Sequence, residues 1–445
     1  METIHRNENQ MKIQRAVRAP LKNDPTYRIS ISRLEKNIIE LGKIGRSEAD
    51  GGVYRMAFTQ ADLEARKWLL NKIEEIGLVG SFDGAMNVFG VDDRAKTKSS
   101  FLIGSHLDSV PKAGVLDGPL GVLAALECMQ VIRENNIPLK ENLELVATSD
   151  EEGRFGGMLG AEAICGEITL DRIRKAKDVQ GNKLEDCMRA VGFDPQMIMS
   201  AQRHRQNLSG YLELHIEQGP VLERQNCDIG VVESISGIFH WKVNLIGEAN
   251  HSGTTPMNMR KDAFQGLCEF AGEIPRILEE NGSDQARATI GKVELKPPSP
   301  HTVPGNVEFS LVARDFTQDG LEELEFATRK ALSAISRRRG LKFEFEELSS
   351  IEPTLCDQKI IHAIETQAKK QGVSYMRMPS GAGHDGQFFG KYMPAGMIFI
   401  PSLNGVSHSP DEWSSLEHIE KGTNLMLQTI LALIGKQPSS GHHSK

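Results

Sequence analysis

The chain has 445 residues, of which 39% are hydrophobic and 25% are charged, the composition of a soluble globular protein of about two domains. Its formal net charge of -8 gives no basic field that would favour nucleic acid or an anionic membrane. No apolar run approaches the roughly 20 residues of a membrane span, and the polar start lacks the apolar stretch of a secretory signal. The six cysteines stand singly, which predicts reduced thiols and a cytoplasmic location.

The main part of the chain reads as an α/β domain. The two ends, roughly the first 25 residues and residues 437–445, are polar and predict loose segments. Between them, short apolar runs alternate with amphipathic stretches, as in a sheet flanked by helices. Candidate strands cover residues 101–105, 143–149, 211–216 and 396–401. A candidate helix covers 120–135, and Asp117 and Pro119 at its entry are expected helix-start signals.

The pattern of apolar and polar residues changes at about residue 233. An alternating strand (240–248) precedes a helix (262–282) that Pro275 is expected to break, and two strands follow at 287–295 and 306–316. A long amphipathic helix and a last alternating strand complete the segment at 320–340 and 341–348. The order β-α-β-β-α-β predicts a ferredoxin-like domain. We place this domain at 233–347, inserted between the two parts of the main domain, 26–232 and 348–436.

Four polar clusters follow apolar strands. GSHLDSV, SDEEGRF and HIEQGP come directly after the first three candidate strands, and SHSPDEW follows the fourth after a short loop. Because ligands of open α/β sheets bind at the carboxyl ends of the strands, these clusters are expected to meet in space.

The side chains in these clusters suit a divalent metal ion. They comprise imidazoles and carboxylates without a thiolate, which favours Zn, Mn, Co or Ni: His106, Asp108, Asp117, Glu151, Glu152, His215 and His408. A single His at a strand end is more often structural, and an isolated acidic pair is more often a solvated turn. The pair Glu151–Glu152, however, directly follows a buried strand, where two carboxylates repel each other unless a cation or a proton compensates them. A serine hydrolase is not indicated, since the chain has no GxSxG elbow.

At these residues the sequence resembles the amidase/hydantoinase/carbamoylase family of dinuclear-metal amidohydrolases, within the zinc peptidase/aminoacylase superfamily. The resemblance extends from about Ile39 to Ala432 and includes the blocks GSHLDSVPKAGVLDGPLGVLA, DEEGRFGGMLG, ELHIEQGPVLE, NHSGTTPMNMRKDA, MPSGAGHDGQ and GMIFIPSLNGVSHSPDEW. It implies a mixed-sheet zinc-peptidase-like catalytic domain, with the insert as a dimerisation and lid domain.

The resemblance also implies a site with two divalent cations per subunit. Asp117 would bridge the cations, with His106 and His215 completing one ligand set and Glu152 and His408 the other. Asp108 would orient the ring of His106 from behind. Glu151 would bind no metal and would act as the general base and acid.

Further residues are implied to contact the substrate. His251 would stabilise the oxyanion, reaching the active site of the partner subunit, and Arg314 would clamp the substrate carboxylate, although from the residues alone an ordinary pair with a neighbouring acid such as Asp315 is equally open. The stretch GAGHDG would supply backbone contacts. The implied substrate-binding residues besides Arg314 are His301, Gln218, Gly383 and His384, with Gln387 nearby. Two features depart from the family: many relatives have Asn in place of His301, and the common EEGSRF is EEGRF here, one residue shorter.

The implied activity is hydrolysis of the amide C–N bond of an N-carbamoyl (ureido) amino acid to the free amino acid, CO2 and ammonia. Allantoate amidohydrolase, and an N-acyl-amino acid hydrolase or dipeptidase, are the alternatives within the same fold. A catalytically silent binding protein is a different class, and the intact set of ligands argues against it. We also expect a homodimer formed by the insert, because its alternating strands and amphipathic helix offer an edge and a face for pairing.

Overall fold

The computed structural model describes residues 27–436, so the two polar ends that were expected to be loose lie outside the described residues. The chain divides into two compact units, which are described separately. Unit 1 comprises 27–233, 355–380 and 384–436 of the described chain, and unit 2 comprises 234–354 and 381–383. All six cysteines are free and four of them are buried. Among residues 27–436, no helix has the length and apolar character that crossing a membrane requires.

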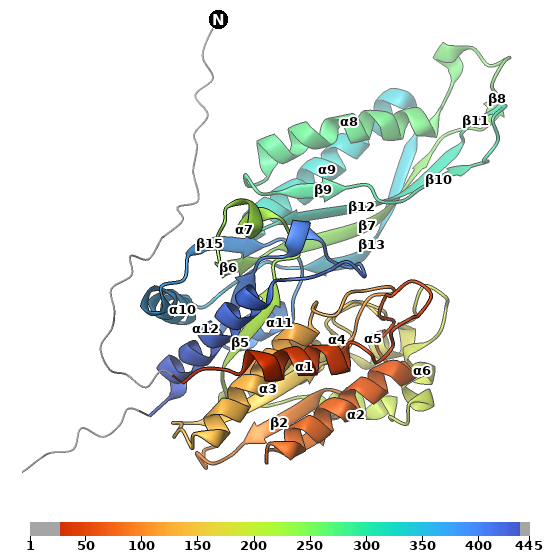
Figure 1. Ribbon diagram of the computed structural model, residues 1–445. Coiled ribbons are helices and arrows are strands. Elements are labelled where there is room, and N and C mark those ends of the chain that lie inside the picture. The colour runs from red at the N-terminus through yellow and green to blue at the C-terminus, as the bar shows by residue number, and fades with distance from the viewer. Residues whose placement is uncertain (1–26, 437–445) are drawn as a thin grey trace, which may run out of the picture. The chain divides into compact units, whose positions relative to one another are not determined.

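Unit 1 is built on a nine-stranded mixed sheet with the order β1-β2-β4-β3-β5-β16-β6-β14, in which β15 pairs with β6 (Figure 1). The strands are β1 Val79–Phe82, β2 Val88–Asp92, β3 Ser100–His106, β4 Asn142–Thr148, β5 Leu208–Ile216, β6 Ile229–Ile235, β14 Thr354–Leu355, β15 Tyr375–Ser380 and β16 Ala395–Ile400. The predicted α/β class with a mixed sheet is confirmed, and each of the four candidate strands is present as β3, β4, β5 or β16.

These four strands form the parallel centre of the sheet. β3 is parallel to both β4 and β5, and β16 is parallel to β5. β2 and β6 pair with this centre in the antiparallel sense, on either side of it. The carboxyl ends of the four central strands therefore meet at one edge of the sheet, the edge at which a ligand crevice is expected.

Helices cover both faces of this sheet. They are α1 Ile31–Leu41, α2 Gln60–Glu75, α3 Pro119–Glu134, α4 Leu159–Cys165, α5 Leu170–Lys175, α6 Leu184–Ala190, α7 Val221–Arg224, α10 Gln358–Gln371, α11 Gly386–Tyr392 and α12 Leu416–Ile434. On β5, the ring centroid of Tyr211 lies 4.5 Å from the ring centroid of Phe389 on α11, whereas Leu214 lies against Gly422 of α12. Because the side chains of a strand alternate between its faces, α11 and α12 lie on opposite sides of the sheet.

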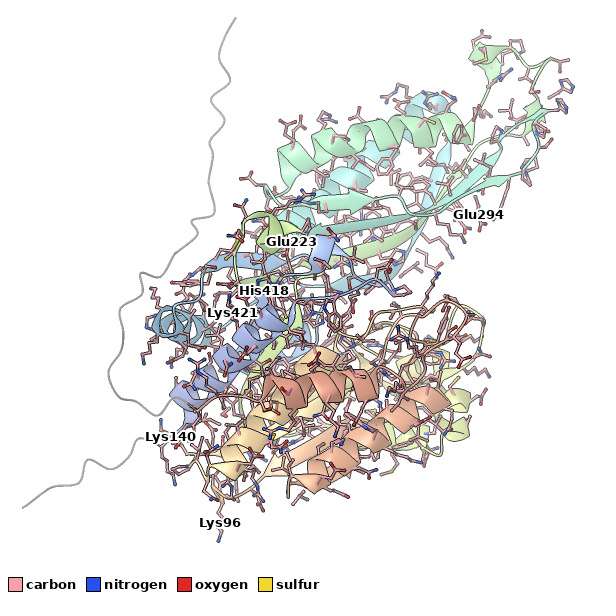
Figure 2. The ribbon with its side chains drawn as sticks, viewed as in Figure 1. Lys96, Lys140, Glu223, Glu294, His418 and Lys421 are labelled. Carbon is pink, nitrogen blue, oxygen red and sulfur yellow. The ribbon has the colours of Figure 1, made fainter. Side chains whose placement is uncertain are left out.

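The last helix of unit 1 is fixed at its start by charged side chains. Lys421 lies on α12 (Figure 2). Its side chain is 2.7 Å from Asp228, the residue before β6, and 2.6 Å from Glu417 one helical turn earlier. Ser415 caps the helix by accepting a hydrogen bond from the backbone N–H of His418. α12 then covers β16 and β5 with the apolar side chains of its buried face.

Unit 2 contains a five-stranded antiparallel sheet with two long helices. Its elements are β7 Gly237–Ile246, β8 Asn250–His251, α8 Ala263–Asn281, β9 Arg287–Thr289, β10 Val293–Lys296, β11 Thr302–Val303, β12 Asn306–Asp315, α9 Gln318–Arg339 and β13 Lys342–Ile351. The sheet order is β10-β12-β7-β13, with β9 also on β12, and β8 and β11 form a separate ribbon (Figure 1). The buried residues of β7 and β12 form a core with those of α8 and α9. The ferredoxin-like assignment of this unit stays a prediction.

Two expectations for unit 2 were wrong. α8 continues through Pro275 to Asn281, because Ile274, Ile277 and Leu278 around that proline pack on the core of the unit and keep the last turns in place. The expected strand at 287–295 is two strands, β9 and β10. Thr289 and Val293 are four positions apart, whereas their partners on β12, Val312 and Phe309, are three positions apart. The extra residue forms an irregularity at Gly291.

Candidate functional site

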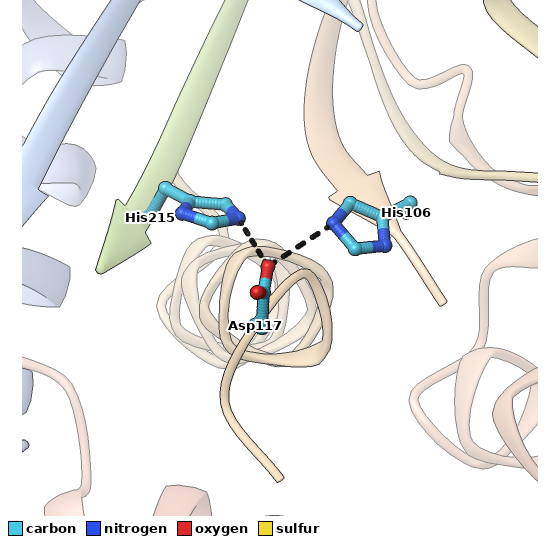
Figure 3. A group of neighbouring side chains, drawn as sticks. All are labelled: His106, Asp117 and His215. Carbon is cyan, nitrogen blue, oxygen red and sulfur yellow. Dashed lines mark ion pairs between the residues drawn. The ribbon is translucent and has the colours of Figure 1, made fainter. Parts of the chain in front are cut away.

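Three histidines from distant parts of the sequence surround one carboxylate in unit 1. His106 ends β3, His215 lies near the end of β5, and Asp117 lies two residues before α3. One oxygen of Asp117 is 3.5 Å from Nε2 of His106 and 3.2 Å from Nε2 of His215 (Figure 3). Its other oxygen is 3.1 Å from Nε2 of His408, in the loop after β16.

The acidic pair after β4 completes the cluster. Glu152 lies 3.4 Å from Nε2 of His408, and Glu151 lies 3.7 Å from Nε2 of His106. Two groups of side chains that include Asp117 have ligand atoms close enough to hold a metal ion. The ligand atoms of each group lie within 4.8 Å of one another, and the groups are His106, Asp117 and His215, and Asp117, Glu152 and His408. Asp117 belongs to both groups and Glu151 to neither.

The backbone sets the protonation of two of the imidazoles. Nδ1 of His106 lies 3.0 Å from the carbonyl oxygen of Asp108, and Nδ1 of His215 lies 2.8 Å from that of Ile216. A carbonyl oxygen only accepts hydrogen bonds, so the proton of each neutral ring is assigned to Nδ1 and the lone pair to Nε2. The lone pair on Nε2 of each ring then faces an oxygen of Asp117. These atoms are all hydrogen-bond acceptors and repel one another, unless a cation or an additional proton lies between them.

Asp117 does not cap α3, contrary to the expectation from sequence. The residue at the cap position is Gly118, whose φ is 81°, and no side chain caps the helix, although Pro119 does occupy its first turn. A Cβ atom on Gly118 would lie within 2.6 Å of three atoms of the His106 ring, so only glycine fits between that ring and the helix. The carboxylate of Asp117 instead accepts hydrogen bonds from Gln218 Nε2 at 2.7 Å and Ser407 Oγ at 2.9 Å.

A second buried carboxylate, Glu412, supports Asp117 from behind. One of its oxygens accepts hydrogen bonds from the backbone N–H groups of Leu116 and Asp117, each at 3.0 Å. The other oxygen lies 2.8 Å from Ser407 Oγ, whose single proton can go to either Glu412 or Asp117, and accepts a hydrogen bond from the N–H of His408 at 3.3 Å. Glu412 thereby joins the loop that carries Asp117 to the loop that carries His408, whose φ of 53° is uncommon for a residue other than glycine.

Asp108 contacts both the ring of His106 and the acidic pair. The contact to the ring comes from the backbone carbonyl of Asp108. The carboxylate accepts hydrogen bonds from the N–H groups of Glu151 at 3.3 Å and Glu152 at 3.2 Å. Asp108 therefore holds the turn after β4 in the orientation that brings both glutamates to the imidazoles.

Burial and the close approach of charged groups shift the pKa values in the site. Burial alone would raise the pKa of Asp117, but hydrogen bonds with the three histidines hold this pKa well below its usual value. Burial raises the pKa of Glu151 well above the usual range, and burial together with the charge of Asp117 raises the pKa of Glu152 to about 7. The hydrogen bond with Asp117 is the main reason why the pKa of His408 is raised to about 9. A divalent cation beside these oxygens would favour their charged forms.

The imidazoles and carboxylates of the two groups are the ligand types that divalent cations take in proteins. Oε1 of Glu152 is buried and has no hydrogen-bond partner within the described structure, which suits a metal ligand. A third possible group, Glu213 with His215 and His384, fits less well because protein groups already satisfy it. The carboxylate of Glu213 accepts hydrogen bonds from Ser105 at 2.6 Å and Tyr211 at 3.0 Å, and His384 contacts Ser380 at 2.9 Å.

The other predicted site residues divide between the two units. In unit 1, Gln218 bonds to Asp117, and the buried ring of His384 packs with its centroid 4.6 Å from that of His215. Gln387 is buried at the start of α11. The remaining predicted residues lie in unit 2: His251, His301, Arg314 and Gly383. There, His251 pairs with Thr302, the residue after His301, and Arg314 donates a hydrogen bond to the carbonyl oxygen of Gly381 at 3.0 Å.

Sequence reasoning missed three buried charges that support the site. Glu213 interrupts the apolar pattern of β5 two residues before His215, and Glu412 lies in the same block as His408, so both carried a signal that could have been read. Arg66 of α2 carried none. It is fully buried, bonds to Asp62 and to the carbonyl oxygen of Thr148 at the end of β4, and lies 3.8 Å from Asp108.

Comparisons with known proteins give consistent matches. The model of peptidase family M20/M25/M40 matches residues 102–432. The chain is 33% identical over 411 residues to N-carbamoyl-L-amino-acid amidohydrolase of Pseudomonas sp. (strain NS671), covering 91% of this chain and 99% of that one. It is also 33% identical over 410 residues to allantoate amidohydrolase of Bacillus subtilis (strain 168), with 91% and 98% covered. A solved structure of an amidase of the hydantoinase/carbamoylase family from Burkholderia multivorans has a TM-score of 0.83 and 30% identity, with 92% of this chain and 98% of that chain covered.

Proposed function

The chain belongs to peptidase family M20/M25/M40 and is a hydrolase of C–N bonds other than peptide bonds, and on this basis we propose that it cleaves an N-carbamoyl (ureido) amino acid to the free amino acid, CO2 and ammonia. The amidohydrolases similar to this chain are named for ureido compounds, which supports this substrate class. We propose two divalent cations per subunit, Zn or else Mn, Co or Ni, because the ligands are imidazoles and carboxylates. The free cysteines support a reducing, cytoplasmic location.

The observation that carries the proposal is the pair of ligand groups joined by Asp117, with Glu151 beside them but outside both. Two cations bound there would polarise the scissile carbonyl and make water a stronger nucleophile at neutral pH. Glu151 is buried and lies 3.7 Å from a ligand imidazole, a position from which it can take the proton of the attacking water. The same carboxyl group would then deliver that proton to the leaving nitrogen.

Residues of unit 2 are proposed to bind the substrate. Arg314 would clamp the carboxylate, with His301 and Gly383 contributing contacts, and His251 would stabilise the negative charge that develops on the carbonyl oxygen. Within unit 2, Arg314 and His251 are far apart, because β12 runs from Asn306 to Asp315 and the β8–β11 ribbon lies beyond its Asn306 end (Figure 1). Asn306 and Arg314 are eight positions apart along the strand, or about 26 Å. One small substrate can use both side chains only if they come from different copies, which supports a homodimer with shared sites.

Mixing two inactive variants tests the shared site. His251→Ala and Arg314→Ala homodimers should each have low kcat/KM. If each site uses Arg314 of one copy and His251 of the other, a mixed dimer contains one intact site and one doubly defective site. Random exchange of subunits should therefore restore about a quarter of the wild-type activity. No recovery after confirmed exchange, or a monomeric active enzyme in sedimentation, would contradict the shared site.

A panel of substrates tests the proposed reaction. kcat/KM is measured for N-carbamoyl-L-amino acids, β-ureidopropionate, allantoate and N-acetyl-amino acids, with ammonia as the readout for the ureido compounds. We expect the best N-carbamoyl amino acid to exceed the N-acetyl derivative of the same amino acid by at least about tenfold, since a site shaped for the second nitrogen leaves polar groups unpaired without it. Equal turnover of acetyl and carbamoyl substrates would favour an acyl-amino acid hydrolase, and a preference for allantoate would favour the allantoate amidohydrolase alternative.

A further inference from the structure

A cavity of about 360 Å³ opens beside the candidate metal centre, entirely within unit 1. Glu152 and Asp108 line it on the side of the metal ligands. Apolar side chains from three separate segments form other parts of its wall: Met56, Val110, Pro111 and Val179. The volume lies at the lower end of the range of roughly 300–1,000 Å³ for small-molecule sites, so it suits one substituent of a small substrate.

Arg154 holds the segments around this cavity together. It belongs to the turn after Glu152. Its Nη1 donates a hydrogen bond to the carbonyl oxygen of Ala57 at 2.6 Å, beside Met56. Its Nη2 and Nε bond to the carboxylate of Asp178 at 3.1 Å and 3.3 Å. The guanidinium is thereby paired with an acid of this chain.

The Val179 turn is ordered by the same aspartate. The carboxylate of Asp178 accepts hydrogen bonds from the backbone N–H groups of Gln180 at 3.0 Å and Asn182 at 2.9 Å. The N–H of Asp178 in turn donates to the carbonyl oxygen of Asn182 at 2.9 Å. This small closed turn presents Val179 with 97% of the residue exposed, an unusual place for a valine on an ordered turn. A ligand in the cavity would bury part of this side chain and gain hydrophobic free energy.

From these contacts we infer that the cavity receives the side chain of the substrate amino acid, and that this side chain is apolar, either a longer aliphatic chain or an aromatic ring. The inference rests on the proposed function and specifies its substrate class. Of the charged groups of the wall, Asp178 is bonded to Arg154, Asp108 to two backbone N–H groups, and Glu152 belongs to a candidate metal-ligand group. The second ureido group of allantoate would lose its hydrogen bonds with water against the apolar part of this wall, which disfavours it.

The ratio of kcat/KM for N-carbamoyl-L-leucine to that for N-carbamoylglycine tests the inference. We expect a ratio of at least about 10 for the wild-type enzyme, because the leucine side chain buries apolar surface in the cavity and glycine has no side chain to bury. In Val179→Asp the ratio should fall by about tenfold, through loss of kcat/KM for the leucine substrate while that for the glycine substrate is retained. Because the ratio is taken within one variant, a partial loss of folded enzyme cancels from it.

Val79→Asp is the matched control. Val79 is also exposed, at 62%, but lies on β1 and does not line the cavity, so this variant should keep the wild-type ratio. A wild-type enzyme that cleaves both carbamoyl substrates equally well, or an unchanged ratio in Val179→Asp, would overturn the inference and leave the proposed function standing. An enzyme that cleaves no N-carbamoyl amino acid would overturn the proposed function, and the inference with it.

Discussion

Glu151→Gln is expected to keep the bound cations and to lose about 10²–10⁴-fold in kcat, the range that general acid–base catalysis contributes. Glutamine has nearly the same size as glutamate but cannot accept the proton of the attacking water. The cations should stay because Glu151 belongs to neither ligand group; its recorded contact in the cluster is with the imidazole of His106, at 3.7 Å. The measurements are kcat on the best substrate of the panel and the metal content of the same preparation.

The same substitution at a surface glutamate tests whether the loss of rate is specific to Glu151. Glu417 lies on α12 with its side chain 72% exposed, and Glu417→Gln should change neither kcat nor metal content. If Glu151→Gln keeps its rate within about tenfold of wild type, Glu151 is not the base. If it loses its cations instead, Glu151 is a ligand and the assignment of Glu151 and Glu152 must be exchanged.

Asp117→Asn is expected to release cations from both ligand groups and to lower kcat/KM by at least about 10³-fold, since a cation supplies several kcal/mol of transition-state stabilisation and each 1.36 kcal/mol is tenfold in rate. Both oxygens of Asp117 face histidine nitrogens, one towards His106 and His215 and the other towards His408. An amide supplies one weak oxygen donor and places an N–H₂ group where the second ligand atom belongs. Metal content and kcat/KM of the variant are the readouts.

The control for this variant is Asp171→Asn on α5. The side chain of Asp171 is 72% exposed and pairs with Lys175 on the surface, so both metal content and rate should stay at the wild-type level. An Asp117→Asn enzyme with a full complement of cations and a normal rate would show that Asp117 does not join the two ligand groups.

The strands and their ends could be predicted because the local sequence determines them. Apolar runs identify β3, β4, β5 and β16, and a polar residue at the end of each marks where the strand leaves the core. The rule that carboxyl ends of parallel strands converge then brings His106, His215 and the Glu151–Glu152 pair to one edge. The structure has this arrangement, with each of those side chains 3.2–3.7 Å from a partner in the cluster.

The contacts that hold the site residues in place join segments far apart in the sequence, so the local sequence could not predict them. Asp117 before Pro119 has the sequence of a helix cap, and only the approach of three histidines shows that its carboxylate faces them. Glu412 bonds to the backbone of Leu116 and Asp117 across 296 and 295 positions of sequence, respectively. In the same way, Pro275 signals a helix end, but the apolar neighbours that keep α8 intact take their partners from the rest of unit 2.

Metal analysis of the purified wild-type protein tests the central claim most directly. The account predicts about two equivalents of divalent cation per chain, one for each ligand group, with activity lost on removal by a chelator and restored by Zn, Mn, Co or Ni. A chelator-stripped protein that holds no cation and still hydrolyses its substrate at the full rate would contradict it.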